Sequence, residues 1–353
     1  MSLLKTFIRI MISLVTVAAI GFWINVSDKE NQGVPDNQDY TVSDENQDEN
    51  IQPSSAIHFK TEGLFRLIGS TKKEVRKQLG EPSRVDLSAY GYDWWIYNKN
   101  QDEYLQVGMD KGKAVTVYAL GKDVDISPFY IGQSIGDIYA MNIIDTNISF
   151  EYKDSSYHFE LSEEEINTNP LIHIENVFVQ LYIDKFTGEL SSIRLMNAPT
   201  LIKIRPYELL FRGDLLEPPN DIEIDEKKLE RDLEMQVHEM ANIFRIRHKA
   251  EPLQLDEKIA EAAYSHSVDM FESNNFSSTS EEYGEVSERL RAGGVNFQSF
   301  GENIAYDYID AADVLEGWLN DKEYRDHLLN ADFTHFGAGV YKNYYTMDMI
   351  QRQ

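Results

Sequence analysis

The 353-residue sequence contains no cysteine. Without thiols the chain can form no disulfide and no thiolate zinc site, it cannot carry a lipid on cysteine, and it has no thiol nucleophile. Basic residues are also scarce, since 33 Lys and Arg stand against 60 Asp and Glu and give a formal net charge of −27. This charge repels phosphate backbones and anionic lipid headgroups, so we expect no nucleic acid as a partner.

Apolar residues, by contrast, are abundant. Hydrophobic residues make up 42% of the sequence and include 20 Tyr and 17 Phe, which is enough to build buried cores. A chain of this length is too long for one average core. The sequence therefore predicts a folded protein with two or three domains.

The first 57 residues differ from the rest. An apolar run from Ile10 to Val26 follows Lys5 and Arg9 and opens into an acidic stretch, which is the charge pattern of an exported segment with its N-terminus inside. We interpret residues 1–26 as an uncleaved signal anchor, with a cleaved signal peptide as the alternative, and residues 27–57 as an acidic disordered linker. The protein is then expected on the extracellular face of the membrane, which it contacts only through this segment, or secreted.

Residues 58–215 contain an internal repeat, with copies at about 58–125 and 126–205. "LIGSTKKEV" and "YIGQSIGDI" match in type at an offset of 63, while "YLQVGMDKG" and "FVQLYIDKFTG" match at an offset of 74. We assign the extra residues of the second copy to "LSEEEINTNP". In each copy the hydroxyl residue is expected to cap a short helix, and aromatic and β-branched segments after it predict antiparallel strands. Of the adjacent Trp94 and Trp95, at least one is expected in the core.

After "LLEPPND", residues 225–353 predict a second α+β domain in which helices outnumber strands. "HEMAN" is half of a zinc-protease motif, but Asn242 stands where the second histidine is required. The letters of "SHSVD" lie too close together on one helix to act as a catalytic triad. We interpret His266 in that segment as a core histidine with its hydrogen bonds satisfied, because it shares an apolar face with Ile259, Ala263 and Met270.

Both folded regions resemble known families. "LGEPSRVDLSAYGYDWWIYN" and "GKAVTVYALG" resemble the domain found N-terminal to bacterial CAP domains, and "FGENIA", "VLEGWLN" and "FTHFGAGVYKNYYTMDMI" resemble the CAP/SCP superfamily of cysteine-rich secretory, antigen 5 and pathogenesis-related-1 proteins. The whole chain looks like the anchored or secreted two-part proteins of spore-forming Gram-positive bacteria. The resemblance implies tandem α+β modules followed by a three-layer α-β-α sandwich with a central cleft, an α+β fold overall.

The resemblance also implies where the cleft lies. In the superfamily it is typically lined by two histidines and two acids that can hold a divalent cation. The matching positions in this chain are Ser278, Glu302, Asp321 and Tyr324, so both histidines are replaced. Beside them we expect Asn303, Arg325 paired with a carboxylate in or next to the cleft, and His327 making a local hydrogen bond, with a displaced metal ligand as its alternative role.

These replacements decide the expected function. Oxygen ligands alone do not favour zinc, so we expect no cofactor beyond a weak calcium or magnesium site. The preferred interpretation is a non-catalytic extracellular binding or interaction module at the cell envelope with a degenerate cleft, whose ligand or partner the sequence does not name. The alternative is a cell-envelope hydrolase, protease-like or wall-acting, in which Glu302 is the general base; such an enzyme also needs a nucleophile or a metal.

Overall fold

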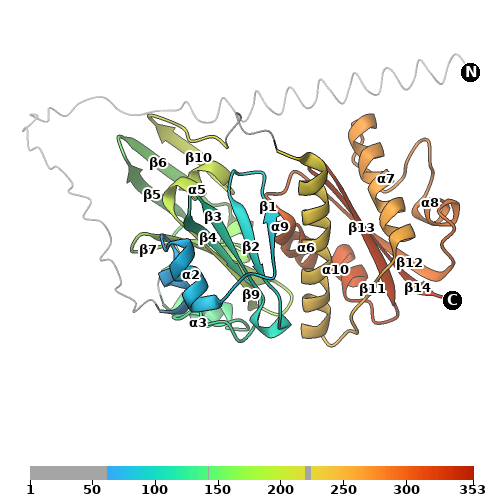
Figure 1. Cartoon of the computed structure of the whole chain (residues 1–353), viewed down its shortest axis with the longest axis horizontal. Coiled ribbons are helices and arrows are strands. Elements are labelled where there is room, and N and C mark those ends of the chain that lie inside the picture. The colour runs from blue at the N-terminus through green and yellow to red at the C-terminus, as the bar shows by residue number, and fades with distance from the viewer. Residues whose placement is uncertain (1–61, 142, 219–223) are drawn as a thin grey trace, which may run out of the picture. The chain divides into compact units, whose positions relative to one another are not determined.

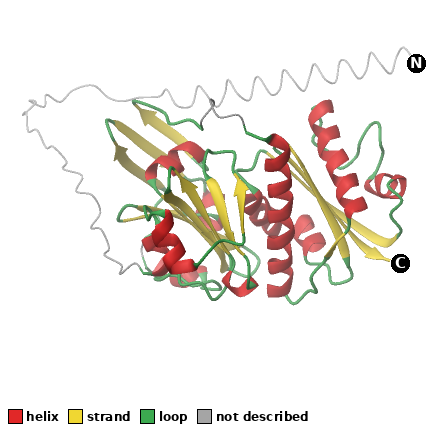
Figure 2. Cartoon of the chain, viewed as in Figure 1, coloured by secondary structure: helices red, strands yellow, loops and turns green. Residues whose placement is uncertain are grey.

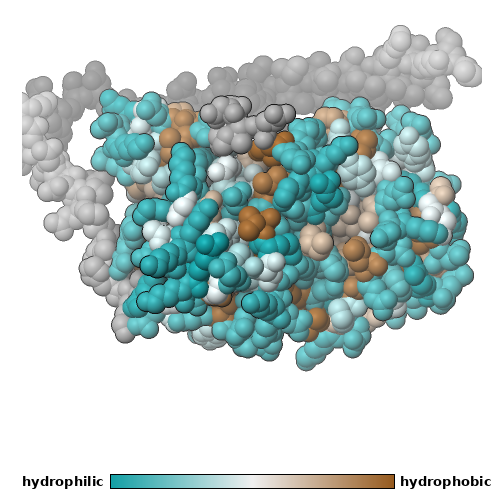
Figure 3. Space-filling model, in the orientation of Figure 1, coloured by the Kyte–Doolittle hydropathy of each residue, from teal (hydrophilic) through white to brown (hydrophobic). Residues whose placement is uncertain are grey.

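The computed structural model describes residues 62–141, 143–218 and 224–353. The expected signal anchor and the acidic linker lie outside these residues. Within the described ranges no helix combines the length and the apolar character that a membrane span requires. The face of the molecule seen in Figure 3 is mostly hydrophilic, with scattered apolar residues.

The N-terminal half of the described chain is built on a seven-stranded antiparallel sheet with the order β1-β2-β3-β4-β9-β8-β7 (Figure 1). Its strands are β1 (Arg84–Leu87), β2 (Asp93–Tyr97), β3 (Leu105–Asp110), β4 (Lys113–Ala119), β7 (Leu171–Ile174), β8 (Val177–Asp184) and β9 (Glu189–Met196). A separate three-stranded sheet contains β5 (Asn147–Tyr152), β6 (Ser155–Glu160) and β10 (Glu208–Arg212). The helices are η2 (Gly63–Leu67), α2 (Lys72–Leu79), η3 (Gln101–Glu103), α3 (Ile135–Ala140), α4 (Glu163–Thr168) and α5 (Ala198–Ile204).

The two sequence copies begin with the same local structure. Thr71 caps α2 and Ser134 caps α3, each hydroxyl accepting a hydrogen bond from the backbone N–H three residues on. The backbone N–H of Gly69 donates to the carbonyl of Ala114 at 2.8 Å, and that of Gly132 donates to Leu190 at 2.8 Å. Both glycines have φ near +86°, at +85° and +87°, a conformation that favours glycine. The short helix α4 occupies the segment assigned to the extra residues of the second copy.

The C-terminal half forms three layers around a four-stranded sheet with the order β11-β13-β14-β12 (Figure 2). Its strands are β11 (Gln254–Leu255), β12 (Phe297–Tyr306), β13 (His335–Tyr341) and β14 (Tyr344–Arg352). One face packs against α7 (Glu257–Ser273) and α8 (Val286–Ala292), the other against α6 (Glu226–Arg247), α9 (Ala311–Asn320) and α10 (Lys322–Leu328). The α+β class and the α-β-α sandwich expected from the sequence are confirmed.

The seven-stranded sheet is covered on both faces. Trp94 and Trp95 point to opposite sides of β2, and both are buried, at 1% and 4% exposure. Trp95 belongs to a core shared with α2 and α3, whereas Trp94 belongs to a core that contains Phe244 of α6 and Leu315 of α9. The second face of this sheet therefore packs directly on the helices of the C-terminal half, and the two halves share one hydrophobic core.

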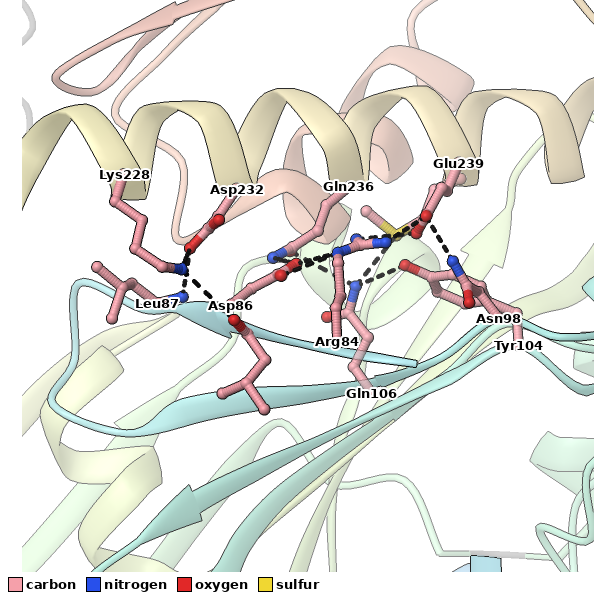
Figure 4. Close-up of polar contacts among 12 residues, drawn as sticks. Arg84, Asp86, Leu87, Asn98, Tyr104, Gln106, Lys228, Asp232, Gln236 and Glu239 are labelled. Carbon is pink, nitrogen blue, oxygen red and sulfur yellow. Dashed lines mark hydrogen bonds and ion pairs between the residues drawn. The ribbon is translucent and has the colours of Figure 1, made fainter. Parts of the chain in front are cut away.

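Polar contacts surround that shared core. In Figure 4, β1 lies along α6, where Arg84 pairs with Glu239 and the Gln236 amide donates to Asp86 at 3.0 Å. Deeper in the contact, Arg194 of β9 forms a two-pronged ion pair with Asp310, the residue that caps α9, at 2.9 and 2.7 Å. Arg194 is fully buried. Removing either charge of such a pair would leave the other buried and uncompensated, so the two halves are held in one arrangement.

Candidate functional site

Glu302 lies in the middle of β12, inside the segment that resembles the family motif. Side chains alternate along a strand, so Glu302 faces α7 and α8 while its neighbour Asn303 faces the opposite side. The Glu302 carboxylate accepts a hydrogen bond from the Arg289 guanidinium of α8, and the two side chains are only 2% and 4% exposed. The carboxylate is thus neutralised inside the protein rather than presented to solvent.

Asp348 of β14 lies directly opposite Glu302 in the sheet. Opposed side chains in antiparallel strands have their Cβ atoms roughly 4.5–5.5 Å apart, so two carboxylates here would repel each other. Asp348 is fully buried, and neither of its carboxyl oxygens has a hydrogen-bond partner in the described part of the chain. Burial and the nearby charge of Glu302 raise the pKa of Asp348 well above its usual range. Burial therefore favours the protonated form of Asp348.

His266 of α7 completes this buried cluster. Its Nε2 lies 3.9 Å from a Glu302 oxygen and its Nδ1 lies 3.9 Å from an Asp269 oxygen, both too long for hydrogen bonds. Burial lowers the pKa of His266, which keeps the imidazole neutral. The histidine is buried, as the sequence indicated, and neither ring nitrogen has a side-chain hydrogen-bond partner among the described residues.

A groove of about 1150 Å³ runs between α7 and α8, with His266 and Arg289 in its wall. Its lining carries two cationic side chains, Lys258 and Arg289, against a larger set of acids: Glu261, Asp269, Glu272, Glu281, Glu282 and Glu288. The groove therefore attracts positively charged groups and repels anions. Sequence reasoning missed it because the acids come from three separate segments that each look like an ordinary solvated surface.

Ser278, at the position of the first family histidine, lies close to this cluster. Its carbonyl oxygen accepts a hydrogen bond from Arg289 at 2.8 Å, and the carbonyl of Gly284 accepts another at 2.9 Å. One guanidinium therefore holds both Glu302 and the loop that contains Ser278. The structure brings these two sequence-derived positions together through Arg289, a residue that the sequence analysis did not select.

Tyr324, at the position of the second family histidine, is half-buried against Met270, Ile304 and Tyr344. Burial, with the neighbouring Asp321 carboxylate, raises the pKa of Tyr324 to about 12, so the phenol is neutral. Asp321 itself is the N-cap of α10, where one carboxylate oxygen accepts hydrogen bonds from the backbone of Glu323 at 2.9 Å and of Tyr324 at 3.0 Å. Tyr324 thus takes part in a hydrophobic contact, and Asp321 caps a helix.

Of the three neighbouring residues, Asn303 and His327 make hydrogen bonds within the C-terminal half, whereas Arg325 contacts the N-terminal half. Asn303 donates to the Tyr324 carbonyl at 2.9 Å, and His327 Nδ1 donates to the Glu302 carbonyl at 3.0 Å, which is the local hydrogen bond expected for this histidine. Arg325 instead pairs with both carboxylate oxygens of Asp184, at 2.9 and 2.8 Å. Asp184 belongs to β8, so the expected partner in or beside the cleft was wrong, and Arg325 links the two halves of the chain.

The residues present do not fit the divalent cation that the family cleft can hold. No imidazole stands at positions 278 and 324, and the Glu302 carboxylate is engaged by Arg289. Across residues 62–141, 143–218 and 224–353, no group of three or more histidines and acids is arranged to hold a metal ion. These side chains instead form a buried polar cluster beneath an acidic groove.

The fold and the sequence comparisons define the class of protein. Residues 238–351 match the cysteine-rich secretory protein family, called CAP, and residues 68–207 match the CAP-associated N-terminal family. The chain belongs to the CAP family, in the form that carries the CAP-associated N-terminal domain. It is 44% identical to the "uncharacterized membrane protein YlbC" of Bacillus subtilis over 319 residues, which cover 90% of this chain and 92% of that protein.

Two solved structures share both halves. An extracellular protein containing an SCP domain from Bacillus anthracis is 38% identical, with a TM-score of 0.78 over 86% of this chain and 99% of its own. A cysteine-rich secretory protein from Staphylococcus aureus is 25% identical, with a TM-score of 0.72 over 82% of this chain and 96% of its own. Both likenesses extend over more than four fifths of the chain and therefore cover both halves.

Proposed function

We propose that this protein is a non-catalytic binding or interaction module of the cell envelope, held at the extracellular face of the membrane by its N-terminal segment. The charge pattern around residues 10–26 supports the anchored location. So do the similarities to a protein named as a membrane protein and to one described as extracellular. The binding surface of this proposal is the acidic groove between α7 and α8, beside the degenerate cleft.

The ion pair between Glu302 and Arg289 carries the non-catalytic part of the proposal. A general base must reach the proton it abstracts, and it needs a nucleophile or a bound metal to act with. The Glu302 side chain is 2% exposed and its carboxylate is held by a guanidinium. The positions at which the family presents imidazoles contain Ser278 and the half-buried phenol of Tyr324. This geometry favours holding a ligand in the groove over chemistry at Glu302.

Calorimetric titration of the full chain with zinc and with calcium tests the degenerate cleft. We expect no tight zinc binding by the native chain, and a gain of zinc affinity in the double variant Ser278→His with Tyr324→His, because imidazole nitrogens are strong zinc ligands. A variant with Ser277→His in place of Ser278→His is the matched control for a histidine added to the same loop. Tight zinc binding by the native chain that Glu302→Ala abolishes would overturn the proposal.

One observation favours the hydrolase alternative: His266 Nε2 lies 3.9 Å from the Glu302 carboxylate, close enough to approach it after a small side-chain movement. Release of peptides from casein and of sugars from purified cell walls would measure such an activity. On our proposal neither substrate is consumed. Turnover that disappears in Glu302→Gln but persists in Glu257→Gln, a change at an exposed residue in the first turn of α7 that does not line the groove, would establish the hydrolase instead.

A further inference from the structure

The three-stranded sheet of the N-terminal half has a free edge along β10. Among the described strands β10 pairs on one side only, with β6, and Figure 1 shows β5, β6 and β10 together at the upper left. Two large apolar side chains of this strand are exposed, Leu210 at 53% and Phe211 at 47%. An exposed edge strand with apolar side chains is a template on which a further strand can pair.

The sequence of β10 is complementary to itself. It is ELLFR, with an acid at one end, a base at the other and three apolar residues between them. If two copies pair antiparallel with Leu210 opposite Leu210, then Glu208 of each copy lies opposite Arg212 of the other, and Leu209 lies opposite Phe211. Opposite charges placed directly across an antiparallel pair stabilise it. A surface that is complementary to itself is what a two-fold symmetric contact requires.

The charges at the two ends of β10 have no partners within the chain. In the described part of the protein neither Glu208 nor Arg212 forms an ion pair. Glu208 lies directly opposite Glu160 of β6, where two like charges repel each other. His158 Nε2 lies 3.3 Å from the Glu160 carboxylate, but this imidazole carries a charge only when protonated. An arginine placed opposite Glu208 on the free edge would offset the repulsion, and Arg212 of a second copy would stand there.

The apolar side chains of β10 continue the core of the small sheet. Leu209 packs at the margin of the core around Phe159. Phe211 lies opposite Tyr157 of β6, whose ring stacks on Phe150 with 5.6 Å between the ring centres. In the symmetric pairing Leu209 of one copy would cover Phe211 of the other, so that the two cores would join across the contact. Burial of this apolar surface favours association.

The opposite edge of the same sheet, β5, is not complementary to itself. Its sequence, NISFEY, contains a single charged residue, Glu151. Antiparallel pairing of two β5 strands about their centre would place Glu151 opposite Ile148, a carboxylate against an apolar side chain. Of the two edges of this sheet, β10 is therefore the one that fits a second copy of the chain.

We propose that two copies of this protein associate through β10, which pairs antiparallel with itself about Leu210 and joins the two small sheets into one continuous sheet. Five residues from each copy make a small contact, so the dimer is weak and reversible in dilute solution. The membrane anchoring proposed above confines both chains to one surface and thereby raises their effective concentration.

Single cysteines test the pairing directly, because the chain has none of its own. In the full chain in detergent micelles, Leu210→Cys should form a disulfide-linked dimer under mild oxidation, since opposed residues in antiparallel strands have Cα atoms about 4.5–5.5 Å apart. Leu255→Cys is the matched control, a leucine of equal exposure, at 52%, on the edge strand β11. We expect cross-linking about tenfold faster at position 210 than at position 255, because pairing holds the two thiols together. Equal rates would overturn the proposal.

Exchange of the charges tests the partner and the register. In the Leu210→Cys background, Glu208→Arg or Arg212→Glu places like charges opposite each other twice in the dimer and should slow cross-linking about tenfold. The double exchange restores both ion pairs and should restore the rate. Both residues are exposed, so these changes leave the core untouched. A double variant as slow as the single ones would show that β10 pairs with another segment or another protein, and would overturn the proposal.

Discussion

Replacement of Arg289 by methionine tests the buried polar cluster around Glu302. The guanidinium contacts the Glu302 carboxylate and donates to the carbonyls of Ser278 and Gly284 at 2.8 and 2.9 Å. Methionine retains much of the apolar stem but none of these contacts. The Glu302 charge would then remain buried beside Asp348 without a cation.

The expected cost follows from that uncompensated charge. Removing one partner of a buried ion pair lowers the free energy of unfolding by about 3–5 kcal/mol. Arg291→Met on the same helix is the control, because Arg291 is exposed and its guanidinium lies over the Phe297 ring at 5.1 Å. That contact is worth about 0.5–1 kcal/mol. The double variant Arg289→Met with Glu302→Gln should recover a large part of the loss, since no buried charge is left behind.

Urea unfolding followed by circular dichroism measures all four proteins. Arg289→Met should move the midpoint strongly and Arg291→Met only slightly, with unchanged slopes if the transitions remain two-state. Equal, small losses in the two single variants would refute the view that this ion pair holds the cluster. A double variant less stable than Arg289→Met would show that Glu302 stabilises the fold through some other partner.

Three further perturbations test the contact between the two halves. Burial raises the pKa of Glu316 from 4.5 to about 7, so the contribution of Glu316 to stability is present at acid pH and is lost as pH rises from about 4.5 to 7. In urea unfolding, the native chain should therefore lose stability relative to Glu316→Gln, on the order of 3 kcal/mol between pH 5 and pH 8. Trp94→Ala and Trp95→Ala should each cost about 3–5 kcal/mol, but only Trp94→Ala should let limited proteolysis separate the halves, because Trp95 faces the other core. Arg325→Ala should lower the thermal midpoint by several degrees, whereas the exposed Lys322→Ala should leave it nearly unchanged.

The secondary structure of both halves could be predicted because local signals and tertiary structure agree. The caps at Thr71 and Ser134 depend only on a hydroxyl and the N–H groups that follow it. The packing of the halves could not be predicted in the same way. On the face of the seven-stranded sheet that meets the helices of the CAP domain, Gln106, Gln180 and Arg194 alternate with apolar residues and suggest contact with water, yet all three are buried.

The candidate site, too, could be predicted only in part from the sequence. Sequence motifs located Glu302, Ser278 and Tyr324, but the side chains that decide the state of Glu302 come from segments with no motif of their own. Arg289 lies on a short helix and Asp348 on the last strand, and only the fold places them beside Glu302. Local spacing did carry one weak signal, since His266 and Asp269 stand three residues apart on α7.

The contacts of α10 with β12 have a further consequence for solubility. β12 is the last strand of its sheet, so its outer backbone groups could pair with a strand from another chain. The His327 ring donates a hydrogen bond to the Glu302 carbonyl and packs against Gly301, where a Cβ atom would lie 2.9 Å from the ring. The helix that bears Tyr324 in place of the family histidine thus also shields a strand edge. Substitutions that destabilise the packing of α10 should therefore promote self-association of the chain before they weaken the binding of any ligand.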